Sequence, residues 1–305
     1  MRTAFINQLT EDAKINEKIF LLVGDLGFSV VEPFAELFPE RFLNVGIAEQ
    51  NMAGIASGLA MEGFCVFIYS IANFPTLRCM EQTRYDICYH NLNVKIVAVG
   101  GGYAYGPLGP SHHATEEIGM LRTIPNLIVC APGDPVETKA ITAFCSRTDK
   151  PCYIRVGKAG EPYVHDRKTV LNFSLGNILE IRKNGEIAVF VMGAMLKYVT
   201  DFINQNEIES SIYSFPFIKP INKTQLLKLF KSYKKIITIE EHQASCGFGS
   251  AILELMNDLL EEGNLDSPPM IKRIAIHDKF YSVAGSQEYL RKLAKIELSE
   301  NDFKF

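Results

Sequence analysis

The stretch RFLNVGIAEQNMAGIASGLAMEG, residues 41–63, predicts a closely packed helix over Ile47–Met61. Small residues that let other backbones approach closely recur along it: Ala48, Ala53, Gly54, Ala56, Gly58 and Ala60. A carboxylate, Glu49, stands in the first turn. A helix so apolar and small-sided is unsuited to a solvent-exposed surface, so we expect it to pack deep in the molecule or against another subunit.

Two effects compete at Glu49. The helix N-terminus favours the ionised carboxylate, by up to about 1 kcal/mol at exposed sites. Burial among alanines and glycines favours the neutral acid instead. A first-turn glutamate that caps an exposed helix end is the ordinary interpretation, but a buried acid needs a partner. A basic ring nitrogen of a bound heterocycle would be such a partner.

Apolar runs alternate with helical patterns along the whole 305-residue chain. We predict strands at Phe20–Val23, Val66–Tyr69, Lys95–Val99, Leu127–Cys130, Cys152–Val156, Ile187–Val191, Ser211–Ser214, Lys235–Ile239 and Ile271–Ile276. We predict further helices at Thr3–Asn16, Asp134–Ser146, Tyr198–Asn206, Gly249–Leu260 and Ser286–Leu293. This alternation predicts an α/β fold with mainly parallel sheets flanked by helices. A polar segment, GKAGEPYVHDRKT, predicts two domains, residues 1–160 and 173–305, joined by a linker at 161–172.

Composition excludes several classes of protein. The net charge is −4 and there is no basic run, so we expect no nucleic-acid partner. No apolar stretch approaches the roughly 20 residues of a membrane span, and the start of the chain lacks a signal-peptide core. Seven cysteines without CxxC spacing indicate free thiols and a cytoplasmic protein. We predict no metal site within the chain, since no cluster has suitable ligand spacing.

The stretch at 41–63 resembles the central motif of the transketolase family. The resemblance implies a pyrimidine-binding domain that holds thiamine diphosphate. Glu49 matches the family's glutamate, which hydrogen-bonds the aminopyrimidine ring and promotes the proton transfer that activates the thiazolium. A carboxylic acid shielded from water suits such proton sharing with a ring nitrogen.

Further segments resemble the family in the same order. GDLGFS, residues 24–29, resembles the turn after the first strand, which implies that Asp25 and Leu26 lie at the cofactor and that Ser29 binds a substrate phosphate. Arg2 and Arg155, the latter in YIRVGK, match the arginines that grip the same phosphate. A guanidinium fork suits phosphate geometry well.

Two more segments complete the predicted site. GPSHHATEE resembles the loop whose first histidine contacts the sugar, which is His112 here. YSIANF resembles the segment whose aromatic residue stacks on the aminopyrimidine, for which we choose Phe74, with Tyr69 as the second choice. EEHQASCGFGSA and DKFYSVAGSQEYLRK resemble the family's C-terminal domain, which is mainly structural and supports self-association.

The diphosphate-binding motif of the family, Gly-Asp-Gly followed by an asparagine pair, does not occur. The chain therefore resembles the C-terminal subunit of a split transketolase. This implies an N-terminal partner subunit that holds the diphosphate and Mg²⁺ (or Ca²⁺), in a heterotetramer of two plus two chains. In the sugar-binding loop, Leu108 replaces the usual acid and Gly100–Tyr105 replaces an upstream histidine, so we expect a sugar that differs from the usual pentose phosphates.

Three alternatives stay open. The β-subunit of a 2-oxoacid dehydrogenase first component has the same two domains and the same glutamate, and IANFPT fits it. A one-chain synthase of the deoxyxylulose phosphate type would need the missing domain. A non-catalytic scaffold subunit would not need Glu49. Because His112 and Arg155 suit a phosphosugar, we expect a transketolase subunit that transfers a two-carbon ketol unit between phosphorylated sugars.

Overall fold

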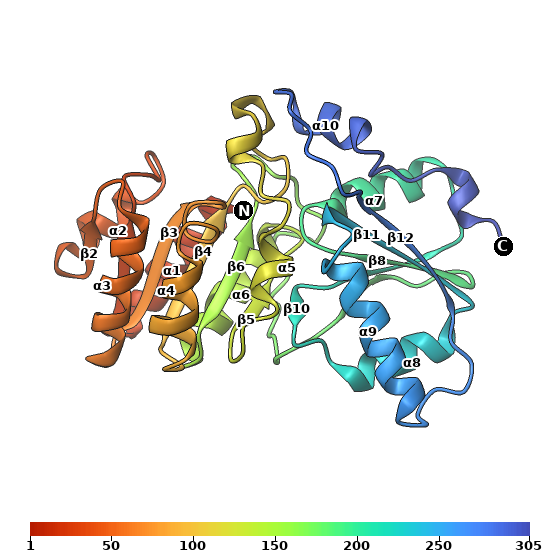
Figure 1. Cartoon of the computed structure of the whole chain (residues 1–305), viewed down its shortest axis with the longest axis horizontal. Helices are drawn as coiled ribbons and strands as arrows, with labels where there is room; N and C mark the ends of the chain where they lie inside the picture. The colour runs from red at the N-terminus through yellow and green to blue at the C-terminus, as the bar shows by residue number, and fades with distance from the viewer.

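Two sheets organise the chain, and the computed structural model describes all residues from Met1 to Phe305. The first sheet has seven strands in the order β10-β5-β6-β4-β3-β1-β2, and the second has five in the order β12-β11-β8-β9-β7. Figure 1 shows the two sheets side by side along the longest axis, each with its own helices. The predicted α/β fold with two mainly parallel sheets is confirmed.

The strands are β1 (Ile19–Val23), β2 (Phe42–Asn44), β3 (Cys65–Ile71), β4 (Val94–Val99), β5 (Ile128–Cys130), β6 (Cys152–Val156), β7 (Leu179–Arg182), β8 (Ile187–Val191), β9 (Ser211–Ser214), β10 (Phe217–Lys219), β11 (Lys235–Gln243) and β12 (Met270–Ile276). The helices are α1 (Arg2–Ile15), α2 (Glu32–Leu37), α3 (Glu49–Met61), α4 (Met80–Gln82), α5 (Glu117–Leu121), α6 (Pro135–Arg147), α7 (Met195–Gln205), α8 (Lys223–Ser232), α9 (Phe248–Glu261) and α10 (Gln287–Leu293). A π-helical turn, Thr83–Cys88, directly follows α4.

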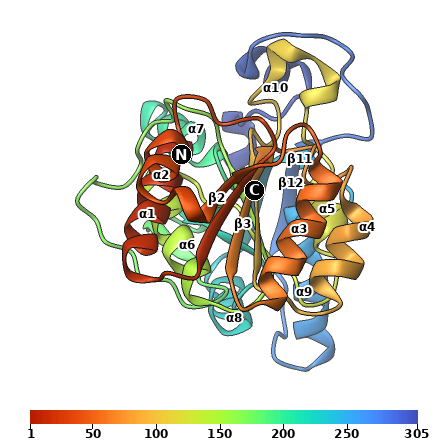
Figure 2. The same cartoon turned by 90° about the vertical axis from the view of Figure 1, so that its left-hand side faces the viewer.

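Helices cover both faces of the first sheet. Figure 2 shows α1, α2 and α6 on one face and α3, α4 and α5 on the other. Side chains alternate along each strand, so Ile68 of β3 packs with α3, whereas Phe67 and Tyr69 pack with α1. Because both faces are covered, β3 and β4 are buried and mostly apolar, with Ser70 and Lys95 as the polar exceptions.

The three strands absent from the sequence prediction are edge strands. β2, β7 and β10 lie at sheet edges, and β7 and β10 pair antiparallel with their neighbours. They have three or four residues each and no long apolar run, because an edge strand is not enclosed by two neighbours. β10 comes from the second half of the chain but completes the first sheet against β5, so it joins the two halves.

Two further features bear on the expectations from composition. None of the helices is both long enough and apolar enough to span a membrane. All seven cysteines are free thiols; six are buried and Cys246 is exposed.

Candidate active site

Glu49 lies in a polar corner at the carboxyl ends of β1 and β3. It is the first residue of α3 and only 2% exposed. Gly24, directly after β1, lies beside it, since a Cβ there would be in ordinary contact with Glu49 Cγ (3.7 Å) and Ser70 Oγ (3.8 Å). The Ser70 hydroxyl is buried without a hydrogen-bond partner. This corner therefore holds a buried carboxylate and an unsatisfied hydroxyl where open α/β sheets bind ligands.

The partner of Glu49 is an arginine that the sequence did not reveal. Arg78 Nη1 lies 2.6 Å from Glu49 Oε2, and the arginine side chain is 49% exposed. Its guanidinium lies over the ring of Phe74, 5.1 Å from the ring centroid. Phe74 in turn packs edge to face against His112, with the centroids 5.4 Å apart. The structure thus brings together three predicted residues, Glu49, Phe74 and His112, and Arg78 links them.

The loop of His112 is held by a neighbouring amide. Asn73 Nδ2 donates to the carbonyls of Ser111 (3.2 Å) and His113 (2.6 Å), and Asn73 is 9% exposed. Ser111 Oγ lies 3.0 Å from His112 Nδ1. Since Asn73 bonds the residues on both sides of His112, it fixes the backbone position from which the imidazole extends.

Three predicted residues lie on the loop between β1 and α2, next to the Glu49 corner. Asp25 and Ser29 are exposed and have positive φ values of 55° and 61°. Asn44, at the end of β2, accepts from the Asp25 backbone N–H (3.0 Å) and donates to Asp25 Oδ1 (3.2 Å). Leu26 is half-buried between them. This loop is therefore fixed through neighbouring strand ends, and its outer side faces solvent.

Tyr69 and Arg2 lie on the other face of the sheet. Tyr69 is 2% exposed and stacks on Phe5 of α1, with centroids 5.8 Å apart and an interplanar angle of 13°. Arg2 is half-buried beside Tyr69 and Tyr105. A ring enclosed in the α1 layer cannot stack on a ligand at the opposite face, so the geometry favours Phe74 over Tyr69 as the stacking residue.

Arg155 lies where the two sheets meet. It is 7% exposed; its Nε is 2.9 Å from Glu117 Oε1, and its Nη2 donates to the carbonyls of Ala114 (2.7 Å) and Glu241 (3.0 Å). Burial raises the pKa of Glu117, while the Arg155 charge opposes that rise. These contacts make Arg155 an internal link between the β4–α5 loop region and β11. Its predicted phosphate contact stays a prediction.

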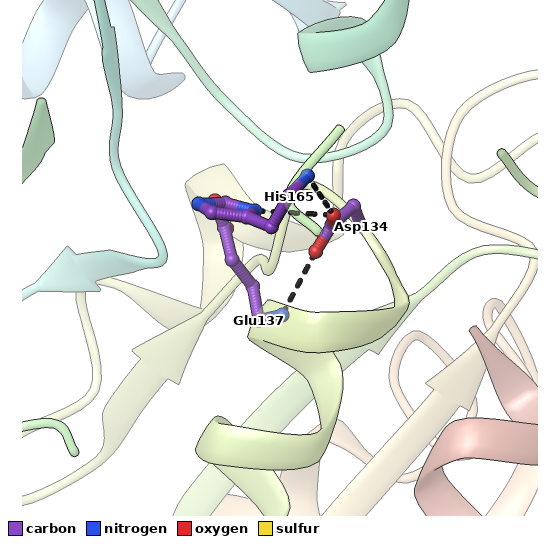
Figure 3. Close-up of side chains that lie close together, drawn as sticks. All are labelled: Asp134, Glu137 and His165. Atoms are coloured by element: carbon purple, nitrogen blue, oxygen red, sulfur yellow. Dashed lines mark hydrogen bonds and ion pairs between the residues drawn. The ribbon is translucent and has the colours of Figure 1, made fainter. Parts of the chain in front are cut away.

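A second titratable cluster lies at the start of α6 (Figure 3). Asp134 caps the helix by accepting from the Glu137 N–H (2.8 Å), and its other oxygen accepts from the His165 N–H (2.9 Å) and lies 3.1 Å from His165 Nδ1. Glu137 Oε1 has no hydrogen-bond partner and lies 3.9 Å from His165 Nε2. Glu137 Oε2 accepts from Ser214 Oγ of β9 (3.0 Å), so the cluster connects the linker, α6 and the second sheet.

Burial controls the ionisation of this second cluster. It raises the pKa of Glu137 to about 7. Burial would lower the pKa of His165, but the hydrogen bond to Asp134 and the charges of Glu137 and Asp134 together raise it. The three side chains could offer ligand atoms to a cation, since these atoms lie within 4.8 Å of one another. However, Asp134 is already occupied by backbone donors, which makes the cluster a structural junction.

Arg78, Asn73 and Ser70 are the site residues that sequence reasoning missed. All three lie on β3 or in the segment that follows it, so their place at the sheet edge follows from the strand prediction. The requirement that a buried acid has a partner indicated a basic ring nitrogen of a bound heterocycle. It did not identify Arg78, because the two residues are 29 positions apart and meet only through the tertiary fold.

Comparison with known proteins identifies the class. Two family models match the chain: "Transketolase, pyrimidine binding domain" over residues 1–160 and "Transketolase, C-terminal domain" over residues 176–295. The fold and these matches define a two-domain α/β protein in which a pyrimidine-binding domain comes first. The chain belongs to the transketolase family and has the two-domain layout of the C-terminal subunits of split transketolases.

Three relatives support this layout. A subunit of the apulose-4-phosphate transketolase from Actinobacillus succinogenes is 34% identical over 86% of this chain and 83% of its own length. A putative transketolase C-terminal section from Methanocaldococcus jannaschii is 31% identical over 95% and 90%. A solved split-gene transketolase, described as an inactive β4 tetramer, superposes with a TM-score of 0.83 at 29% identity, covering 97% of this chain and 93% of that one.

Proposed function

We propose that this chain is the C-terminal subunit of a thiamine-diphosphate-dependent transketolase that transfers a two-carbon ketol unit between phosphorylated sugars. The observation that carries the proposal is the corner formed by Glu49, Phe74 and His112 at the carboxyl edge of the first sheet. The apulose-4-phosphate enzyme, one subunit of which is similar over most of its length, acts on a sugar phosphate by its name.

The residues present fit the aminopyrimidine half of the cofactor. Glu49 offers a buried carboxylate, Ser70 an unsatisfied hydroxyl and Phe74 a half-buried ring at the same sheet edge. Thiamine diphosphate, when bound, supplies the carbanion-stabilising chemistry that no side chain offers. Glu49 would share a proton with a ring nitrogen, which a carboxyl group shielded from water does well. His112 would donate to a sugar oxygen, and the Asn73 amide would hold its loop in place.

The diphosphate and Mg²⁺ (or Ca²⁺) would be held mainly by an N-terminal subunit, in a heterotetramer of two plus two chains. The similar apulose-4-phosphate protein is named as one subunit of its enzyme, which supports a separate partner, and the inactive β4 form of the split-gene enzyme supports self-association without activity. The outer face of α3 supports an interface, because a Cβ at Gly54 or Gly58 would meet no atom and Ile47 is 78% exposed. We retain domains at 1–160 and 173–305 with a linker at 161–172.

Titration calorimetry with thiamine diphosphate and Mg²⁺ tests the proposal. The chain is titrated alone and after co-purification with the diphosphate-domain subunit from its own source. Tight binding by the pair alone, followed by ketol transfer between sugar phosphates, is the expected result. Tight binding by the lone chain would contradict the division of the site. Absence of binding by both would favour a scaffold role, and activity with a 2-oxoacid would favour the dehydrogenase alternative.

A further inference from the structure

The guanidinium of Arg78 makes two contacts in the Glu49 corner. Its Nη1 is 2.6 Å from Glu49 Oε2, and its centre is 5.1 Å from the centroid of the Phe74 ring. These are the two contacts that the proposed function assigns to the aminopyrimidine ring, a hydrogen bond to Glu49 and stacking on Phe74. Arg78 therefore makes the two contacts that the proposed ligand would make.

A guanidinium and an aminopyrimidine resemble each other in the chemistry that this corner recognises. Both are planar, both offer a flat face to an aromatic ring, and both can share a nitrogen-borne proton with a carboxyl group. An aminopyrimidine that entered these contacts would compete with Arg78 for Glu49 Oε2 and for the face of Phe74 that the guanidinium covers. Building on the proposed function, we propose that Arg78 is an internal surrogate for the aminopyrimidine: it pairs with Glu49 in the free chain and leaves when the cofactor binds.

The free chain needs such a partner for Glu49. The carboxylate is 2% exposed, and a buried charge without a counter-ion is strongly destabilising. No other cationic side chain forms an ion pair with Glu49, and no hydrogen bond from another side chain reaches its carboxylate. Arg78 thus neutralises the acid until a ring nitrogen can take over.

The side chain of Arg78 can leave without disturbing the fold. It is 49% exposed, so its displacement opens no cavity in the core. Its backbone stays anchored, because Gln50 Nε2 donates to the Arg78 carbonyl (3.1 Å) and the next residue, Cys79, is fully buried. The exchange is therefore a side-chain rotation about a fixed backbone, and it couples cofactor affinity to the strength of the Glu49–Arg78 ion pair.

The test replaces Arg78 by methionine, which keeps the length of the stem, in the co-purified two-subunit complex. Calorimetry with thiamine diphosphate and Mg²⁺ then measures Kd for the unsubstituted, Arg78→Met and Arg84→Met complexes. Arg84 is a matched control, because it is exposed on the following turn and its guanidinium lies over Tyr85, 4.6 Å from the ring centroid. We expect Arg78→Met to lower Kd about tenfold, since the cofactor no longer has to displace an ion pair. Arg84→Met should leave Kd unchanged.

A second readout uses the full chain alone and needs no cofactor. Arg78→Met should lower the thermal unfolding midpoint more than Arg84→Met, because Glu49 loses its counter-ion. Arg78→Lys keeps the charge but not the planar fork, so its midpoint and its Kd should lie between those of the unsubstituted and methionine proteins. If Arg78→Met folds poorly, Arg78→Lys alone decides the sign of the change in Kd.

The outcomes separate the inference from the proposed function. An unchanged or higher Kd for Arg78→Met, with binding by the unsubstituted complex intact, would overturn the surrogate role and leave the proposed function standing. Absence of cofactor binding by the unsubstituted complex would overturn both. A Kd lowered equally by Arg84→Met would show a general charge effect and would also overturn the surrogate role.

Discussion

Two buried glutamates near helix starts, Glu49 of α3 and Glu137 of α6, have opposite surroundings. Glu49 is 2% exposed and has one ionic partner, the half-exposed Arg78. Glu137 is fully buried and accepts from the Gly133 N–H (2.6 Å) and from Ser214 Oγ, with His165 beside it. The helix starts differ as well, because Asp134 caps α6 with its side chain whereas α3 has no side-chain cap.

The contrast distinguishes the proposed ligand site at Glu49 from the structural junction at Glu137. A carboxylate whose only partner is a half-exposed surface side chain can exchange that partner for a ligand. A carboxylate held by backbone, hydroxyl and imidazole groups from three segments cannot do so without breaking the junction between the sheets. Burial of an acid alone therefore does not identify a functional site, since structural networks bury acids as well.

The largest expected effect separates the two glutamates directly. Glu49→Gln keeps the size of the side chain but cannot share its proton, so ketol transfer by the two-subunit complex should fall about 10³-fold or more. Glu137→Gln is the matched control and should retain activity within a few-fold. Steady-state kinetics with a phosphorylated ketose donor measures both. Comparable losses for the two variants would remove the distinction, and near-normal transfer by Glu49→Gln would refute its proposed role.

The fold was largely predictable from the sequence because most strands are enclosed. All nine predicted strands exist, and most are largely apolar runs such as VKIVAV at Val94–Val99, whose single polar residue is Lys95. The edge strands β2, β7 and β10 lack that signal. The Asp134–His165 contact is likewise long-range, spanning 31 positions, so no local spacing predicts it. The edge strands and the Asp134–His165 contact thus depend on the tertiary fold and not on local sequence patterns.

The predicted site likewise divides into residues that local motifs identified and contacts that only the tertiary fold creates. Residues predicted from motifs at strand ends, such as Glu49 and Phe74, lie together at one edge. Side chains alternate along β3, so Tyr69 faces the layer of α1 and not the side of Glu49. A sequence motif alone does not show which face of the sheet a strand residue takes. The surroundings of Arg155 could not be predicted either, since its partners Glu117 and Glu241 come from other segments.

Arg155 offers the second test. Like Glu137, and unlike Glu49, it is held by groups from several segments of the chain. Arg155→Met leaves Glu117 buried without its counter-ion, so the free energy of unfolding should fall by about 3 kcal/mol. Urea denaturation of the full chain measures this, with the exposed Arg147→Met as control. A stable variant whose KM rises more for phosphorylated sugars than for free sugars would instead support the predicted phosphate contact.

A substitution of Asn73 tests whether its hydrogen bonds position the His112 loop for catalysis. Asn73→Ala removes both hydrogen bonds that hold the His112 loop, so kcat/KM for ketol transfer should fall about tenfold while the cofactor Kd stays unchanged. Asn51→Ala, on the exposed face of α3, is the control. A change in cofactor affinity equal to the change in kcat/KM would show that Asn73 supports the whole corner and not the histidine loop.

The smallest expected effect concerns pH and belongs to the Glu137 cluster. The pKa of Glu137 is about 7 in the native chain against an ordinary value of 4.5, so the native state binds more protons than the unfolded state between these values. Stability should therefore fall as pH rises, by about 1 kcal/mol between pH 6 and pH 8. His165 acts in the same direction, because a raised pKa stabilises the fold only while the imidazole is protonated.

Comparison with Glu137→Gln isolates this contribution. Glu240 is also buried, with a pKa raised to about 7, and adds a slope of the same sign to both proteins. Urea denaturation at pH 6 and pH 8 should give a shallower loss of stability for Glu137→Gln than for the unsubstituted chain. Parallel losses would mean that Glu137 is ionised in the native chain at both pH values. Its unpartnered Oε1 would then be stabilised by protonated His165, and His165→Gln would become the variant that flattens the dependence.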